Sequence, residues 1–169
     1  ANLREAVLAH DWPRLGEARG KIMFVLDDTA EKINLYRGGR AVLEGRAMFV
    51  ATGENSPAAA FVAIPDPQTD AQRIASDVKL GFMVQTRADE NTVEARSGDT
   101  ARRDQAFASG AQIVATDFLM SDASIGPYQV RLKDGHRAVC DVRNAPERCI
   151  GWGLERTIPP PTLLTAAKR

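Results

Sequence analysis

Five short apolar runs are spaced along the first two thirds of the chain, and most of them end in Asp, Asn or Arg. Within each run the apolar residues are continuous rather than alternating with polar ones, which is typical of strands that are covered on both faces of a parallel sheet. Because helical segments separate most of these runs, the pattern predicts an α/β fold. The predicted strands are residues 21–28, 47–52, 59–64, 82–86 and 111–116.

Capping residues mark the helices between these strands. Asn91 is a candidate N-cap, and Glu94 follows it at the spacing of a capping box. A helix is predicted from there to about Ser109, where Gly110 ends it. The other predicted helices are residues 3–15, 30–36 and 69–81.

The pattern changes after residue 120. Residues 128–132 alternate like an exposed β-ribbon, and residues 138–142 are predicted to be the returning strand of a hairpin. The consecutive prolines 159–161 predict an extended tail. We therefore expect residues 1–120 to form the α/β body, and residues 121–169 to form a hairpin, a disulfide loop and a Pro-rich tail packed on the same domain.

Composition and charge exclude several classes of protein. The 169 residues are 44% hydrophobic, so the chain can bury a real core, and 22 basic residues balance 22 acidic ones. A net charge of zero argues against a nucleic-acid-binding surface spread over the whole chain, and we predict no nucleic-acid partner. No apolar run reaches the roughly 18 residues of a membrane span.

The only two cysteines, Cys140 and Cys149, stand nine positions apart in a loop-like region. In an exported protein such a pair closes a short disulfide loop, whereas in a cytosolic protein both would be free thiols; we favour the disulfide. The cysteines have no partners at zinc spacing. P-loop, dinucleotide-binding, HExxH and GxSxG motifs are also absent from the sequence.

Several segments together resemble one known family. RADENTVEAR, DTARRDQAFASGAQIVATDF and RAVCDVRNAPERC are similar to the C-terminal half of the calcium-dependent bacterial phosphatidylinositol-specific phospholipases C. The resemblance extends back through DWPRLGEARGKIMFVLDD and GRAMFV, so it covers about residues 11–150. These enzymes belong to the phospholipase C-like phosphodiesterases, a superfamily of distorted TIM barrels.

The resemblance implies a parallel (β/α) TIM-barrel-like fold of which this chain, through residues 1–120, is the C-terminal half. A complete barrel typically needs at least ~200 residues. In the family, the two catalytic histidines and most calcium ligands lie on the early strands, so both are expected outside this chain, and an N-terminal half-barrel polypeptide is an expected partner. His10 and His136, which follow no predicted strand, are expected to be surface residues.

Asp117 is the candidate catalytic residue, because it ends the last predicted strand, where α/β folds place catalytic groups. The resemblance implies that such a carboxylate orients a catalytic histidine. The alternative is a loop aspartate that binds backbone N–H groups.

Three further residues are candidates for substrate binding. Arg87 and Asp89 follow the preceding strand with the same parity, so both are expected to face the barrel mouth. Arg87 is a candidate phosphate ligand and Asp89 a candidate acceptor of inositol hydroxyl groups, or the two form an ion pair. Asp27 and Asp28 end the first strand, and one of them is expected to face the mouth. For this residue, with Asp27 as the substrate-binding candidate, a metal or sugar-hydroxyl role and a helix-capping role are equally expected.

The function implied by the resemblance is cleavage of the glycerol–phosphate bond of phosphoinositides by acid–base chemistry, with calcium and with transient contact at a membrane surface. Gln85 stands where the family usually has arginine, which keeps a glycerophosphodiesterase-like activity open. A non-catalytic binding module or half-barrel is the alternative from a different class. The resemblance and the cysteine pair together favour a secreted or periplasmic protein.

Overall fold

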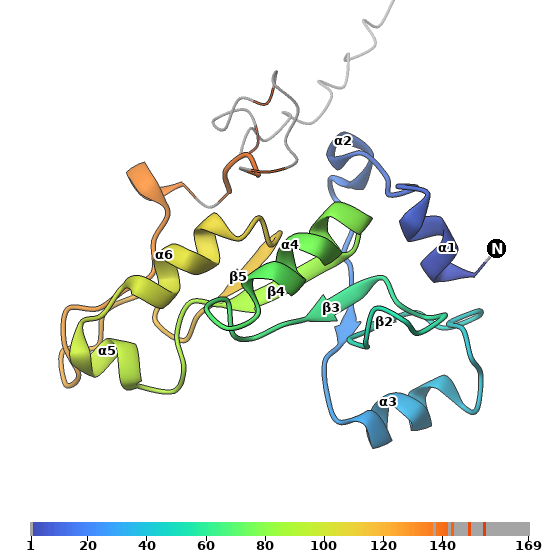
Figure 1. Ribbon diagram of the computed structural model, residues 1–169, viewed down its shortest axis with the longest axis horizontal. Helices are drawn as coiled ribbons and strands as arrows, with labels where there is room; N and C mark the ends of the chain where they lie inside the picture. The colour runs from blue at the N-terminus through green and yellow to red at the C-terminus, as the bar shows by residue number, and fades with distance from the viewer. Residues whose placement is uncertain (1, 137, 142, 144–148, 150–153, 155–169) are drawn as a thin grey trace, which may run out of the picture. The chain divides into compact units, whose positions relative to one another are not determined.

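The computed structural model of the chain describes residues 2–136, 138–141, 143, 149 and 154 (Figure 1). Two compact units are present: one comprises Ala1–Val130 with Asp141–Asn144, and the other comprises Arg131–Cys140 with Ala145–Arg169. The first unit contains the sheets and the candidate site. The predicted division at residue 120 stays a prediction.

The strands form two small parallel sheets, one in which β1 pairs with β2 and one in the order β3-β4-β5. A parallel bridge between Ala51 and Phe61 links the end of β2 to β3, so neighbouring strands follow the order of the sequence. The predicted α/β class with parallel strands is confirmed. The described residues form no closed barrel, and the half-barrel stays a prediction. The strands are β1 Val25–Leu26, β2 Phe49–Val50, β3 Phe61–Ala63, β4 Met83–Arg87 and β5 Ile113–Ala115.

Most strands are shorter than their apolar runs. The first predicted strand covers residues 21–28, but only Val25–Leu26 pairs with β2, and the large apolar side chains of Ile22, Met23 and Phe24 before it are exposed. Hydrophobicity predicts burial, whereas a strand also needs a neighbouring backbone to receive its hydrogen bonds. β2 supplies that backbone over two residues only.

Helices separate the described strands along the chain except β2 and β3, which follow each other directly, and α4 and α6 both contact β4 (Figure 1). Gly38 and Gly81 end α3 and α4 in left-handed conformations, which glycine adopts without a steric penalty. The helices are α1 Leu3–Leu8, α2 Leu15–Ala18, α3 Ala30–Arg37, α4 Ala71–Leu80, α5 Val93–Ser97 and α6 Ala101–Ala108.

The predicted helix over residues 91–109 is wrong in two respects. Gly98 is left-handed and divides it into α5 and α6. Asn91 is not the cap, because it is itself left-handed with φ of 52°, and Thr92 occupies the N-cap position. The Glu94 side chain instead accepts a hydrogen bond from the backbone N–H of Glu90 at 2.8 Å.

The predicted hairpin is also wrong in the part that the structure describes. Neither residues 128–132 nor residues 138–141 form a strand, and Lys133–Gly135 is a short 3-10 turn. Tyr128 and Val130 are buried in a cluster with Phe118, and the Val130 N–H donates to the Phe118 carbonyl at 2.8 Å. The alternation in this segment therefore reflects packing against the body. Val142 and the Pro-rich tail lie outside the described residues.

The largest apolar core cluster is built from α1, β3, α4 and β4. Ile74 and Val78 of α4 pack there with Phe82, which lies just before β4. The indole N–H of Trp12 donates to the Gly81 carbonyl at 2.8 Å, which fastens the segment after α1 to the end of α4. This core packs against β3 and β4 and so stabilises the sheet whose carboxyl end carries the candidate site.

Asp77 places a carboxyl group on the buried face of α4. Its Oδ2 atom is buried without a hydrogen-bond partner, and burial, with a smaller effect of Glu54, raises the pKa of this carboxyl above its usual value. A raised pKa in the folded state means that Asp77 supports folding below its unfolded pKa and opposes it as the pH rises through the folded pKa.

We expect Asp77→Asn to raise the free energy of unfolding by about 1 kcal/mol at pH 8, because the charged group no longer has to be buried. Urea denaturation at several pH values would measure this. The gain should shrink as the pH falls toward 4, the range in which a free aspartate takes up its proton. A gain that is the same at pH 4 and pH 8 would contradict the explanation.

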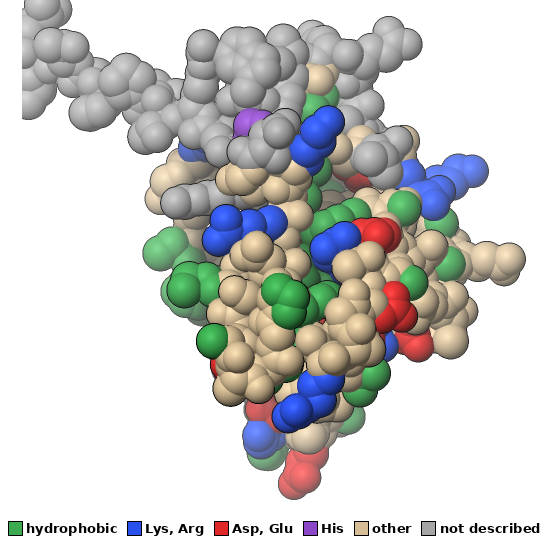
Figure 2. All heavy atoms as spheres, turned by 90° about the vertical axis from the view of Figure 1, so that its left-hand side faces the viewer, with side chains coloured by type: hydrophobic (Ala, Val, Ile, Leu, Met, Phe, Trp, Pro, Cys, Tyr) green, Lys and Arg blue, Asp and Glu red, His purple; other side chains and the backbone are tan. Residues whose placement is uncertain are grey.

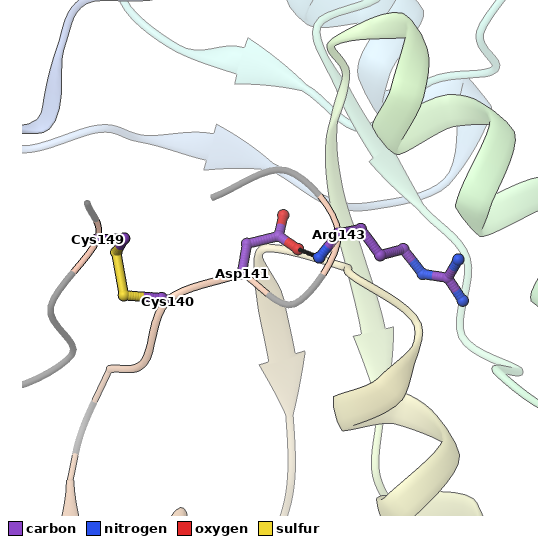
Figure 3. Close-up of a disulfide and its surroundings, with 4 residues drawn as sticks. All are labelled: Cys140, Asp141, Arg143 and Cys149. Atoms are coloured by element: carbon purple, nitrogen blue, oxygen red, sulfur yellow. Dashed lines mark hydrogen bonds between the residues drawn. A yellow bond between two sulfur atoms is a disulfide. The ribbon is translucent and has the colours of Figure 1, made fainter. Parts of the chain in front are cut away.

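The predicted disulfide is confirmed: Cys140 and Cys149 are joined, with their Cα atoms 6.0 Å apart (Figure 3). The same view shows the Asp141 carboxylate accepting a hydrogen bond from the backbone N–H of Arg143 at 2.8 Å. Among the described residues, no helix is both long and apolar enough to cross a bilayer.

Candidate functional site

The carboxyl ends of β4 and β5 bring two of the predicted site residues into direct contact. Arg87 is the last residue of β4, and the register places it opposite Ala115 at the end of β5, two residues before Asp117. The Arg87 Nη2 atom donates to Asp117 Oδ2 at 2.7 Å. Arg87 Nε donates to the backbone carbonyl of Asp89 at 3.1 Å, which fixes the guanidinium from a second side.

Asp89 lies behind this ion pair and has an exposed fraction of 0%. One of its carboxylate oxygens, Oδ2, accepts a hydrogen bond from the Thr116 hydroxyl. The other, Oδ1, accepts from the backbone N–H of Asp117 at 3.0 Å. Asp89 thus supports Asp117 from the protein interior; its predicted contact with substrate hydroxyl groups stays a prediction.

The charges in this group do not cancel. One guanidinium, that of Arg87, lies 2.7 Å from the Asp117 carboxylate and 4.0 Å from the Asp89 carboxylate. Two carboxylates against one cation leave the group with a formal charge of minus one. In this arrangement the site is better suited to hydrogen-bonding neutral hydroxyl groups than to attracting a free anion.

Thr116 and Tyr128 stabilise the loops beneath the site, and neither is a candidate site residue from the sequence. Thr116 Oγ1 accepts from the Phe118 N–H at 2.9 Å. The Phe118 and Tyr128 rings pack edge to face with centroids 5.6 Å apart, and the Tyr128 hydroxyl donates to the Ala88 carbonyl at 3.3 Å. Burial, and then the neighbouring Asp89, raise the pKa of Tyr128 to about 12, so the phenol keeps its proton and remains a donor.

Arg102 of α6 ties together the loops that follow β3 and β4. Its Nη2 atom donates to the Pro65 carbonyl and to Glu90 Oε2, both at 3.0 Å, and its Nη1 lies 3.9 Å from the nearly buried Glu94 carboxylate. Although its position on a helix predicts a solvated side chain, Arg102 is thus largely buried among these partners. A stabilising role for this side chain is not visible in the sequence, because its partners lie 37, 12 and 8 positions away.

Asp27 lies elsewhere. It is exposed at the end of β1, in the sheet that contains β1 and β2 only, and it is not among the hydrogen-bond or ion-pair partners of Arg87, Asp89 or Asp117. Its neighbour Asp28 binds the start of α3. Hydrogen bonds from Lys32, at 2.8 Å, and from the Thr29 N–H, at 2.7 Å, lower the pKa of Asp28.

His10 does not join this group. His10 lies against Gly81, two residues before β4 begins, and so at the opposite end of that strand from Arg87. His136 follows the Lys133–Gly135 turn of the second unit. Neither follows a strand among those that the structure describes, as the sequence predicts.

The described residues do not fit a calcium site. No group of three or more His, Cys, Asp or Glu side chains among them is arranged to hold a metal ion. Both oxygens of Asp89 are engaged in hydrogen bonds, and Asp117 is paired with Arg87. On the face in Figure 2, basic and acidic side chains are interspersed with neutral and apolar ones, and no broad area of one charge stands out.

Comparison with known proteins places the chain in a family. The family model described as Ca²⁺-dependent phosphoinositide phospholipase C matches residues 1–142, which include all five strands that the structure describes and the whole candidate site. No curated protein and no solved structure matches the chain. With strand-end residues Arg87 and Asp117 inside the matched region, the chain belongs to the Ca²⁺-dependent phosphoinositide phospholipase C family.

Proposed function

We propose that this chain supplies the Arg87–Asp117 part of a phosphodiesterase site that cleaves the glycerol–phosphate bond of phosphoinositides. The observation that carries the proposal is the 2.7 Å ion pair at the carboxyl ends of two neighbouring parallel strands, in a chain of this family. Parallel α/β folds place their catalytic groups at this end of the sheet.

Asp117 is suited to orient another group. Its Oδ2 is held by Arg87, its Oδ1 accepts no hydrogen bond from the described residues, and its side chain is 58% exposed. A carboxylate fixed in this way can accept a hydrogen bond from the ring N–H of a histidine, keeping the imidazole in one tautomer and stabilising its charged form. It can equally accept a hydrogen bond from a substrate hydroxyl.

The negative formal charge of the group favours hydroxyl groups of the inositol ring as its ligand. Asp117 Oδ1 would accept a hydrogen bond from one ring hydroxyl. Arg87 Nη1 has no partner among the described residues, and it would donate a hydrogen bond to the adjacent ring hydroxyl. Phosphate binding by Arg87, the role expected from the sequence, stays a prediction. It requires a guanidinium that is already paired with one carboxylate to bind a second anion.

The acid and base are expected outside this chain. In the proposed reaction one histidine removes the proton of the inositol 2-hydroxyl, whose oxygen attacks phosphorus, and another donates a proton to the departing diacylglycerol oxygen. Calcium, on which the family depends, would likewise be held by residues other than those described. Arg87 and Asp117 supply position and orientation in this scheme.

A non-catalytic half-barrel that binds a phosphoinositide headgroup is the second candidate. It is favoured by one observation: Arg87 and Asp117 already satisfy each other at 2.7 Å. Both candidates agree with a secreted or periplasmic location, which we propose from the Cys140–Cys149 disulfide, since such bonds persist in oxidising compartments.

The test is calcium-dependent release of diacylglycerol from phosphatidylinositol by the protein as isolated from its natural source, with denaturing intact-mass analysis of the same sample. We expect activity together with a polypeptide that carries the two histidines. Asp117→Asn should lower kcat/KM by about 10²–10³-fold, because the orienting carboxylate is lost.

Asp104→Asn is the matched control. Asp104 has the same exposed fraction as Asp117, 58%, and also pairs with an arginine, Arg103, at 2.8 Å, but it lies on α6. We expect its activity to equal that of the unchanged protein. Headgroup binding without turnover would support the non-catalytic candidate, and equal losses in both variants would remove Asp117 from the proposed site.

A further inference from the structure

Positive charge is concentrated in the segment that joins α3 to β2. Arg37 is the last residue of α3, and Arg40 and Arg46 follow it before β2 begins. Residues 37–46, the arginine loop, carry these three arginines against one acidic residue, Glu44. The loop therefore has a formal charge of plus two, in a chain that has no net charge.

Backbone carbonyl groups hold the three guanidinium groups in place. Arg37 Nε donates to the Arg40 carbonyl at 3.0 Å, and Arg37 Nη2 donates to the Ala41 carbonyl at 2.5 Å. Arg40 Nη1 donates to the Glu44 carbonyl at 3.2 Å. Arg46 Nη2 donates to the Arg37 carbonyl at 3.3 Å. The arginine loop is thus folded on its own side chains, which fixes where its charges lie.

These contacts position the three charges without neutralising them. None of the three arginines forms an ion pair with a carboxylate among the described residues, in contrast to Arg87 and Arg102. Donors also remain unused, because Arg37 Nη1 and both Nε and Nη2 of Arg40 have no hydrogen-bond partner in the described part of the chain. Like charges held this close repel one another, and a bound anion would relieve that repulsion.

A hollow of about 290 Å³ opens beside two of these arginines. Its lining carries no carboxylate, and it combines guanidinium groups with the side-chain amide of Asn34 and the backbone of Gly39. The Gly39 N–H has no partner among the described residues, so it adds a further donor. The residues that line the hollow are Asn34, Arg37, Gly39, Arg40 and Ala41.

We propose that this hollow binds a phosphate group, with Arg37 and Arg40 as its main ligands. A guanidinium donates two parallel hydrogen bonds to neighbouring phosphate oxygens, and more than one cation matches a dianion better than the single charge of a carboxylate. The hollow lies before the amino end of β2, whereas the candidate site lies at the carboxyl ends of β4 and β5. The proposal therefore does not rest on the proposed function.

Isothermal titration calorimetry of the full chain with inorganic phosphate tests the proposal. Low ionic strength is required, since salt screens exposed charges. We expect the unchanged protein to bind and Arg40→Gln to bind about tenfold more weakly, because a charge-assisted hydrogen bond is lost. Arg40 is exposed, so this variant should still fold. Arg40→Lys should lie between the two, since it keeps the charge but not the planar fork.

Arg96→Gln is the matched control, since it removes the same charge elsewhere. Arg96 is also exposed and without an ion pair among the described residues, but it lies on α5, where its Nε donates to Thr92 Oγ1 at 3.0 Å. We expect this variant to bind phosphate as the unchanged protein does. Equal weakening in Arg40→Gln and Arg96→Gln would show a general effect of net charge and overturn the proposal.

The source of the phosphate group is decided by two further ligands. Binding of glycerol 3-phosphate without binding to vesicles of phosphatidylcholine and phosphatidate would assign the site to a free phosphate or a small phosphate ester. Binding to those vesicles, weakened by Arg40→Gln, would assign it to a lipid headgroup. Either result supports the site. Absence of phosphate binding by the unchanged protein would overturn it, as would binding of a poly-glutamate peptide in place of phosphate.

Discussion

Asp89→Ala should lower the free energy of unfolding by about 3 kcal/mol, because it removes a buried carboxylate together with both of its hydrogen bonds. The Thr116 hydroxyl and the Asp117 N–H both donate to the Asp89 carboxylate, which is fully buried. Urea denaturation of the unchanged chain and the variant would measure the difference.

Asp89→Asn separates the hydrogen bonds from the charge. Its side-chain oxygen can still accept from the Asp117 N–H, and its amide can donate to the Thr116 oxygen, so we expect a loss of only about 1 kcal/mol. Asp104→Ala removes an exposed carboxylate and should cost about 0.5 kcal/mol or less. If the alanine variants at 89 and 104 were equally stable, the buried network would not be contributing.

Arg102→Ala should cost about 3 kcal/mol, because it leaves the Glu94 carboxylate nearly buried and unpaired. It also removes the donor to the Pro65 carbonyl and to Glu90, and with it the link between the loops after β3 and β4. Arg102→Lys should restore only part of the loss, since one ammonium cannot reproduce the fork of a guanidinium.

The next residue provides the control for this prediction. Arg103 lies beside Arg102 on the same helix, but among the described residues its side-chain hydrogen bonds and ion pair are with the exposed Asp104 alone. Arg103→Ala should cost well under about 1 kcal/mol. Chemical denaturation of the two variants in parallel would compare them, and similar midpoints would show that burial of the Arg102 ion pairs does not matter.

The sequence predicts the strand ends that carry the site but not the contacts made there. Arg87 and Asp117 follow consecutive apolar runs, and parallel strands bring such ends together, but the ion pair expected for Arg87 is with Asp89 and not with Asp117. The burial of Asp89 cannot be predicted from the sequence, because the local pattern is the same whether an aspartate after a strand faces solvent or the interior. Thr116, a β-branched residue at a strand end, reads as part of the strand and not as a hydrogen-bonding group.

The same lack of information on tertiary contacts explains the errors in the predicted secondary structure. Asn91 and Glu94 have the spacing of a capping box, yet Glu94 reaches one residue further back, to Glu90, because Asn91 is left-handed. The alternation of apolar and polar residues around Tyr128 and Val130 predicts a β-ribbon. The same alternation is found where a segment only packs against a cluster such as that of Phe118, so it does not establish strand pairing. A local pattern predicts which side chains face the interior, whereas tertiary contacts determine whether the segment pairs as a strand or packs as a loop.

The strand order described above also determines how the chain reaches its fold. Phe61 pairs with Met83, and Gln85 pairs with Ile113, so each pairing closes a loop of roughly 20–30 residues, and doubling such a loop adds only about 0.6 kcal/mol of closure entropy. Neighbouring strands can therefore pair at a low cost in closure entropy. The Arg87–Asp117 pair needs β5 in place, so the site is complete only when the whole β3-β4-β5 sheet has formed.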